Sequence, residues 1–367
     1  MAPIKSTQSR TGGKLIRGGR TGDVTPTDGG RSDHIIDGRR EANYGSILDA
    51  TGGTKIESGN DRYHVFTSPG SFYTGTTIKG AEVLIVAGGG SGGGAAYGAG
   101  GGAGGVLHAP SIDLYKGEFG VTVSGQTEYG GWYTPGGDGD DSSFGDAIAK
   151  GGGAGCGYLN GPADRRGPLA GTITTRGRSG GSSGGSGPQT GGVGSAEVSD
   201  AVLPQPAPSD YTPYGNLGGA GGEGGHPTPA AWYQSGGGGG AGGVGSNAAE
   251  PGTGAAGGPG RAFPSFPAPV IEPGIPAPVR PTWTPVVGPT GVFAGGGGSA
   301  TYYTSGPSAG AAPGGGGRGA GPTTDPGGDG VRFTGSGGGG GNYPQYPLTG
   351  YGGKGADGIV IVKYSVA

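Results

Sequence analysis

The chain has 367 residues, including 102 glycines and 31 prolines, with a formal net charge of −3 and 13% charged residues. Disordered chains have high net charge and few aromatic residues, so 17 tyrosines, 8 phenylalanines and 3 tryptophans argue against disorder. One cysteine, Cys156, excludes an intramolecular disulfide framework, and the opening MAPIKSTQSR lacks the apolar run of a signal peptide. We expect synthesis in a cytoplasm, without secretion by a standard route.

Residues 1–60 are predicted to form an extended, basic arm, because they are polar and show no apolar periodicity. Residues 1–40 carry eight Lys or Arg against four Asp, which gives this segment a net charge of +4. A basic arm is compatible with nucleic-acid binding, but this one has no interleaved aromatic residues for stacking on bases. Docking on another protein is therefore the favoured interpretation.

Residues 61–367 are predicted to form one domain of short strands and glycine-rich segments. RYHVFTS and SFYTGTTI read as strands around a Pro-Gly turn, and FGVTVSG at 119–125 reads as another. AEVLIVA at 81–87 is a continuous apolar run typical of a strand buried on both faces. The chain ends with a second such run, GIVIVKYSV at 358–366. These two strands bracket the glycine region and are expected to pair or pack together. The predicted class is mainly β and irregular, with essentially no α-helix.

Glycine runs recur between these two strands at irregular spacing. They span 88–105, 151–157, 218–225, 236–245, 295–298, 314–319 and 337–341. Glycine can adopt the polyproline II conformation, with three residues per turn and no internal hydrogen bonds. Side-by-side polyglycine helices can satisfy one another's backbone groups, whereas a Cβ directed into the bundle would force them apart. The sequence thus predicts a bundle of polyglycine rods. The alternative is loose glycine linkers between strands.

Motifs for chemistry receive little support. AGGGSGGG after an apolar strand matches the G-x-G-x-x-G dinucleotide fingerprint, but no helix-forming segment follows it. Four separated histidines and one cysteine offer no ligand cluster, and GGDGDD at 136–141 is read as a solvated turn rather than a calcium site. We expect no enzymatic activity, no metal and no cofactor. The histidines are His34, His64, His108 and His226.

Aromatic residues are concentrated in the segments between the glycine runs. The longest is the proline-rich 261–293, which is expected to adopt extended and turn conformations. Tyr and Trp on loops form rigid, amphipathic contacts, which indicates a recognition surface. The alternative is that the rings pack on one another, and we expect about half of them in each role. The candidate contact residues are Trp232, Tyr233, Phe263, Phe266, Trp283, Tyr302, Tyr303, Tyr343 and Tyr346.

The combination of HVFTSPGSF, AEVLIVAGGGSGGG, GGAGGVL, SSFGDAIAKGGGAG and the closing GADGIVIVKY resembles the glycine-rich domains of bacteriophage tail-fibre and other virion proteins. The match covers about residues 61–367 but leaves two long insertions, 157–217 and 246–293. In related fibre-tip adhesins of T-even-type phages, polyglycine II helices form a layered sandwich whose apical loops contact the host receptor. The resemblance implies that arrangement here.

The resemblance also implies a function. We expect a virion protein of tail-fibre or adhesin type that binds a host cell-surface polysaccharide or outer-membrane protein, assembled in the host cytoplasm, without a role in nucleic-acid binding. One alternative is a capsid decoration protein or head fibre with a structural or weak surface-binding role, and another is a depolymerase. A homotrimer and a single chain both remain open. The arm is expected to contact other virion proteins through Lys5, Arg10, Lys14, Arg17 and Arg20.

Overall fold

The computed structural model describes thirteen segments of the chain and divides it into two units, residues 1–50 and 51–367. The described residues are 32–36, 39–43, 50–94, 97–130, 135–157, 177–187, 189–190, 202–224, 234–248, 253–301, 314–321, 326–342 and 350–366. In the first unit, β1 (Ser32–Ile36) pairs antiparallel with β2 (Arg39–Asn43). The second unit begins before the predicted boundary at residue 60, because β3 (Thr54–Ser58) pairs with β4 (Asp61–Phe66).

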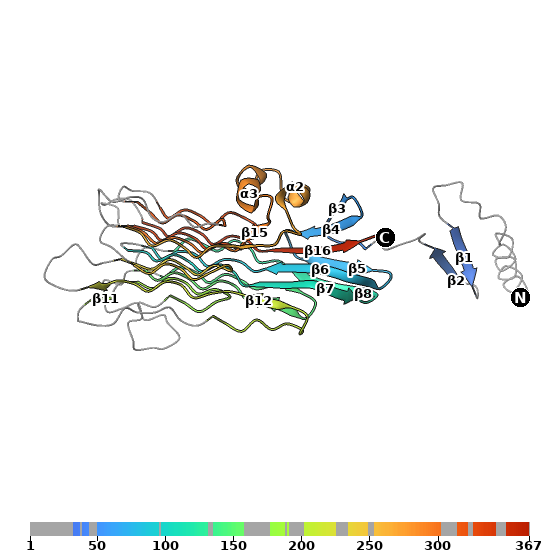
Figure 1. The fold of residues 1–367 in the computed structure, drawn as a ribbon, viewed down its shortest axis with the longest axis horizontal. Helices are drawn as coiled ribbons and strands as arrows, with labels where there is room; N and C mark the ends of the chain where they lie inside the picture. Colours follow the sequence, from blue (N-terminus) through green and yellow to red (C-terminus); the bar gives the residue numbers. More distant parts are fainter. Residues whose placement is uncertain are drawn as a thin grey trace, which may run out of the picture. The chain divides into compact units, whose positions relative to one another are not determined.

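The second unit contains two antiparallel sheets (Figure 1). The six-stranded sheet has the order β12-β7-β6-β16-β4-β3, and the four-stranded sheet has the order β10-β9-β8-β5. Their remaining strands are β5 (Gly70–Thr74), β6 (Ile78–Val86), β7 (Val106–Leu114), β8 (Gly117–Thr122), β9 (Ser142–Phe144), β10 (Ala147–Ala149), β12 (Thr212–Tyr214) and β16 (Ile359–Ser365). Two further pairs of two-residue strands complete the unit: β11 (Gln189–Thr190) with β13 (Glu223–Gly224), and β14 (Arg261–Ala262) with β15 (Val292–Phe293).

The strands β6 and β16 form the centre of the six-stranded sheet. They pair antiparallel from Ile359 opposite Val86 to Lys363 opposite Glu82, which confirms the predicted association of the two most apolar segments. Their alternate side chains are buried on opposite faces. One face packs against the four-stranded sheet, where His64 of β4 meets Phe72 of β5 edge-on with ring centroids 5.1 Å apart. The run AEVLIVA is therefore buried on both faces, as predicted.

The opposite face of this sheet is covered by a helical segment between β14 and β15 (Figure 1). It comprises α2 (Ala268–Ile271), the 3₁₀ turn η2 (Glu272–Gly274) and α3 (Arg280–Val287). We call residues 263–293 the helical cap. The prediction of an extended, proline-rich loop is wrong here, because apolar cap residues pack on Val65, Leu84 and Ile361 of the sheet. The predicted fold class is confirmed: the described residues are mainly β and irregular, with α2 and α3 as short helices.

The glycine runs form rods that continue the strands away from the sheets. Rod 98–105 shows the repeat most clearly, because every third amide reaches the same neighbour. Gly98, Gly101 and Gly104 donate to the carbonyls of Gly341, Gly338 and Gly335 at 2.8–2.9 Å. The amides of Ala99, Gly102 and Gly105 donate to carbonyls of 150–157. The amides of Gly100 and Ala103 donate to carbonyls of 234–240. A three-residue repeat of contacts is that of the polyproline II helix, so the predicted polyglycine rods are present.

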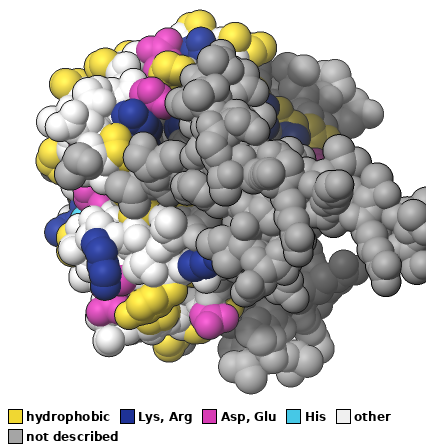
Figure 2. Space-filling model, turned by 90° about the vertical axis from the view of Figure 1, so that its right-hand side faces the viewer, with side chains coloured by type: hydrophobic (Ala, Val, Ile, Leu, Met, Phe, Trp, Pro, Cys, Tyr) yellow, Lys and Arg dark blue, Asp and Glu magenta, His cyan; other side chains and the backbone are white. Residues whose placement is uncertain are grey.

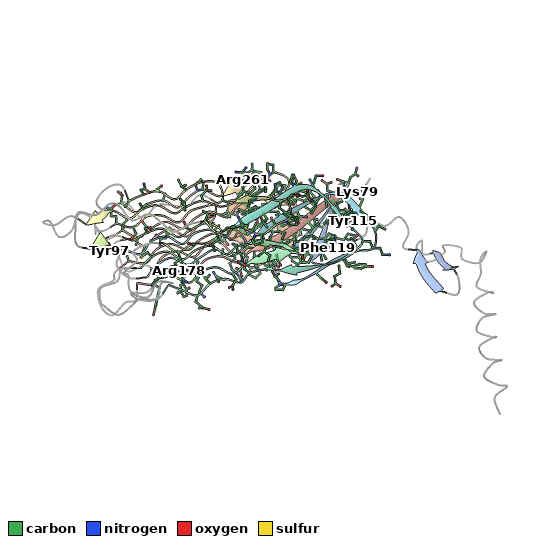
Figure 3. The ribbon with its side chains drawn as sticks, turned by 90° about the horizontal axis from the view of Figure 1, so that it is seen from below. Lys79, Tyr97, Tyr115, Phe119, Arg178 and Arg261 are labelled. Carbon is green, nitrogen blue, oxygen red and sulfur yellow. The ribbon has the colours of Figure 1, made fainter. Side chains whose placement is uncertain are left out.

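Rod 98–105 also accepts hydrogen bonds from three further segments. Amides at 87–93, 182–185 and 297–300 donate to its carbonyls, so six rods surround it, three by donation and three by acceptance. All residues of 98–105 are buried. Six-fold packing satisfies backbone groups that a lone rod would have to expose to water. Figure 3 shows the consequence: side chains crowd the sheet half of this unit and are sparse along the rods.

Candidate functional site

The dinucleotide-like glycines form part of a rod instead of a phosphate cradle. The amides of Gly88, Gly90 and Gly93 donate to the carbonyls of Asp140, Gly102 and Ala99 at 2.9–3.1 Å. A phosphate site needs free amides at a helix N-terminus, and the described residues 88–94 contain no helix. The backbone donors that the motif would offer to a phosphate are already used within the bundle. These residues therefore form the start of the first rod.

The acidic segment at 136–141 satisfies amides of the neighbouring rod. Asp138 accepts from the Ala154 amide at 2.9 Å and pairs with Arg178, while Asp141 accepts from the Gly151 amide at 2.9 Å and pairs with Lys150. Burial raises the pKa of the Asp138 carboxyl, and the Ala154 amide and Arg178 oppose that shift. Among the residues that the structure describes, no group of three or more His, Cys, Asp or Glu could hold a metal ion.

The described histidines and the cysteine are packing residues. His64 is fully buried, with Nδ1 2.7 Å from the Gly52 carbonyl and its ring stacked on Tyr364. His108 Nε2 lies 2.9 Å from Glu82 Oε1, and its ring meets Phe263 at 5.1 Å. Cys156 is buried in a rod. Each has a structural role that uses its polar atoms or its ring. Within the described part of the chain, no helix is long and apolar enough to span a membrane.

Three predicted contact residues lie in the core, which corrects their assignment. Phe263, Phe266 and Trp283 are 3%, 0% and 0% exposed, because the helical cap directs them onto the six-stranded sheet. The Trp283 indole N–H donates to the Phe333 carbonyl at 3.2 Å, so its polar atom is also used. Buried rings of this kind are unavailable to a receptor. The prediction relied on the proline content of 261–293, which does not reveal that the segment packs on the sheet.

The other predicted contact residues fall outside the described residues, but the rods that adjoin their segments end close together. Ser235 Oγ donates to the Tyr97 carbonyl, and Asn342 Nδ2 donates to the carbonyls of Thr301 and Gly321. Figure 3 places Tyr97 at the end of the rods remote from Lys79 and Tyr115 of the sheets. We call this the rod end. The residues outside the description are Trp232, Tyr233, Tyr302, Tyr303, Tyr343 and Tyr346, together with the arm residues Lys5, Arg10, Lys14, Arg17 and Arg20.

Two exposed tyrosines near the rod end form a pair that the predicted contact residues do not include. The rings of Tyr129 and Tyr351 lie 6.2 Å apart between centroids, and the residues are 48% and 38% exposed. Each precedes a Gly-Gly pair, and Gly130 and Gly352 exchange two backbone hydrogen bonds at 3.1–3.2 Å. The repeated tripeptide Tyr-Gly-Gly was the sequence signal that could have identified them together.

The sheet end of this unit mixes charges of both signs. Figure 2 shows described basic, acidic and apolar side chains interspersed on the visible face. Lys79 pairs with Asp113 at 2.6 Å, and this contact raises the pKa of Lys79 and lowers that of Asp113. Tyr115, the most exposed of the large apolar side chains described, lies beside Lys79 at 67% exposure. Recognition through a long-range field of one sign has no support on this face.

Comparison with known protein families identifies the family of this chain. A search of the curated proteins found no relative of the chain. The family model described as a glycine-rich domain matches residues 66–365, which include the four-stranded sheet, most of the six-stranded sheet, the helical cap and the rods. This range begins at the last residue of β4 and finishes with the last residue of β16, so both strands that bracket the glycine region, β6 and β16, lie within the match. The chain therefore belongs to the glycine-rich domain family.

Proposed function

We propose that this chain is a bacteriophage virion protein of tail-fibre or adhesin type. In this proposal the arm attaches the protein to other virion proteins, and the rod bundle holds aromatic segments toward a host surface receptor. The supporting observation is that the two ends of the second unit differ. Its chain enters at the sheets, where Thr51 exchanges backbone hydrogen bonds with Tyr73, whereas the rods adjoining the aromatic-rich segments converge at the rod end.

The construction of the bundle fits that role. A rod with six hydrogen-bonded neighbours is held without side chains, so the sequence of a connecting segment is free to vary without disturbing the lattice. Binding residues placed on loops above a rigid scaffold are a common arrangement in recognition proteins. A rigid support also lowers the entropy lost on binding, because the ends of each loop are already fixed.

The decisive experiment combines localisation with adsorption. Labelled antibody against the protein is expected to mark tail structures of the virion, and excess purified protein is expected to compete with virions for the host cell. Double replacements by serine at Trp232 and Tyr233, or at Tyr302 and Tyr303, should each weaken that competition. Tyr115→Ser at the sheet end serves as the matched control and should compete like the unaltered protein.

Opposite results would favour the capsid alternative. Labelling of the head, together with absence of competition at any protein concentration, would contradict the adhesin proposal. Deletion of the helical cap is unsuitable as a test, because Trp283 and Phe266 lie in the core and their loss would unfold the domain.

A further inference from the structure

The exposed tyrosine pair near the rod end is held by backbone hydrogen bonds between two segments that are distant in sequence. Tyr129 follows a segment that runs beside rod 350–358, and Thr127 exchanges two hydrogen bonds with Gly355, at 3.2 Å and 2.7 Å. The Gly130–Gly352 exchange fixes the backbone immediately after both tyrosines. Two segments more than 200 residues apart in sequence therefore hold two rings at a set separation, with little backbone freedom left to lose on binding.

The two rings form an exposed, tilted aromatic surface, which we call the platform. Their centroids are 6.2 Å apart and their planes are inclined by 36°, which is too close for a ligand to insert between them. Neither phenol hydroxyl has a hydrogen-bond partner among the described residues. An aromatic face carries partial negative charge, so it attracts groups that present polarised C–H bonds.

Charged groups of both signs accompany this platform, and the Lys354 ammonium lies over one face of the Tyr129 ring. The Lys354 ammonium lies 4.6 Å from the centre of the Tyr129 ring and 3.7 Å from the Glu128 carboxylate, whose side chain is 93% exposed. The ammonium supplies hydrogen-bond donors, the carboxylate supplies acceptors, and the two phenols supply both. The platform thus combines an apolar surface with a rim of polar groups at one exposed site.

We infer that Tyr129 and Tyr351 form a binding platform for a hexopyranose unit of a surface polysaccharide. A pyranose ring has a face of axial C–H bonds that stacks on an aromatic ring, and equatorial hydroxyls that reach the polar rim. A protein ligand would instead need a pocket that desolvates an anchoring side chain, whereas here the rings stand out at 38–48% exposure. An open platform binds one sugar weakly, and repeated sugars with several copies of the protein would supply avidity.

This inference deepens the proposed function and rests on it only for the bacterial origin of the polysaccharide. Sugar binding by the purified protein is measurable whether or not the protein is found on a tail. A head location with intact sugar binding would overturn the adhesin proposal and leave the platform standing. A tail location without sugar binding would overturn the platform inference and leave the aromatic-rich segments as the proposed receptor site.

The test uses the full chain with saturation-transfer NMR against methyl glycosides of glucose, galactose, mannose and N-acetylglucosamine. Irradiation of the aromatic protons should transfer saturation to ring C–H protons of at least one sugar. Tyr129→Ala and Tyr351→Ala should each weaken binding about three- to tenfold, whereas Tyr129→Phe should keep most of it because stacking persists. Tyr115→Ala is the control for an exposed tyrosine elsewhere. All variants should melt at the temperature of the unaltered chain, because the substituted side chains are exposed.

Three results would overturn the inference. The first is absence of saturation transfer to all four sugars. The second is binding by both alanine variants that equals binding by the unaltered chain. The third concerns host envelope fractions: if binding survives periodate oxidation of the sugars but is lost after protease digestion, the ligand of the pair is a protein.

Discussion

Replacement of one rod glycine by alanine should destabilise the domain far more than a typical surface substitution. At Gly238, a Cβ atom would lie 1.9 Å from the Gly101 carbonyl oxygen, whereas real Cβ contacts below 3.0 Å are essentially absent. The rods 234–240 and 98–105 would have to separate by at least the difference, 1.1 Å. Their direct hydrogen bonds, Gly100 to Gly236 at 3.2 Å and Ala103 to Gly239 at 2.9 Å, would then be lost.

The cost follows from the buried groups left without partners. Each unsatisfied buried donor or acceptor costs about 1–3 kcal/mol, and the loss of two bonds leaves two donors and two acceptors, so the cost amounts to about 4–12 kcal/mol. A domain is stable by about 5–15 kcal/mol in total. Gly238→Ala should therefore lower the midpoint of denaturant unfolding strongly, and valine at the same position should prevent folding.

A matched control separates the close-packing explanation from a general intolerance of alanine. Gly120 lies on β8 with no atom within 4 Å of a Cβ position, so Gly120→Ala should change stability by about 0.5 kcal/mol or less. Urea unfolding followed by circular dichroism measures both variants. Equal stability of Gly238→Ala and Gly120→Ala, within about 0.5 kcal/mol, would refute the close-packed rods and favour loose linkers.

Other substitutions test the helical cap, the core and the bundle. Trp283→Ala should cost about 3–5 kcal/mol in unfolding free energy, since it removes a fully buried ring and leaves the Phe333 carbonyl without its donor; a loss below 1 kcal/mol would contradict this packing. Burial raises the pKa of Tyr63 to about 12 from 10.0, so the unfolded chain ionises first and stability should fall as pH rises from 10 to 12. Tyr63→Phe should flatten that fall in melting experiments, and an unchanged pH profile would contradict it. Amide hydrogen exchange should be slowest in rod 98–105, where protection below that of β3 at the sheet edge would be inconsistent with six-fold packing.

The strands of the fold could be predicted because their sequences determine their environment. Val83, Ile85, Val360 and Val362 belong to continuous apolar runs, which only a strand covered on both faces can bury within seven to nine residues. Two such runs in one small domain have few ways to be covered, and pairing with each other is the simplest. The prediction of the β6–β16 pair rested on this reasoning.

The helical cap could not be predicted because local and tertiary preferences conflict there. Proline at the first helical positions fits α2 and α3, but Pro285 inside α3 opposes helix formation. Burial of Ile271, Trp283 and Val287 against the sheet outweighs that local cost. The sequence contains both the prolines that oppose a helix and the apolar residues that favour packing. The apolar face of the sheet, which needs a cover, makes the packed helical segment the more stable of the two.

The neighbours of each rod were beyond prediction for a different reason. Polyglycine helices present nearly identical surfaces, so any two could pair in many registers with similar energy. Serines within the rods supply the missing specificity: Ser183 Oγ accepts from the Gly218 amide at 2.9 Å, and Ser299 Oγ accepts from the Ala255 amide at 2.8 Å. Ser336 Oγ donates to the Gly314 carbonyl at 2.8 Å. A shift of one rod by one residue would leave these buried hydroxyls without hydrogen-bond partners. Each serine therefore fixes a register that glycine alone would leave open.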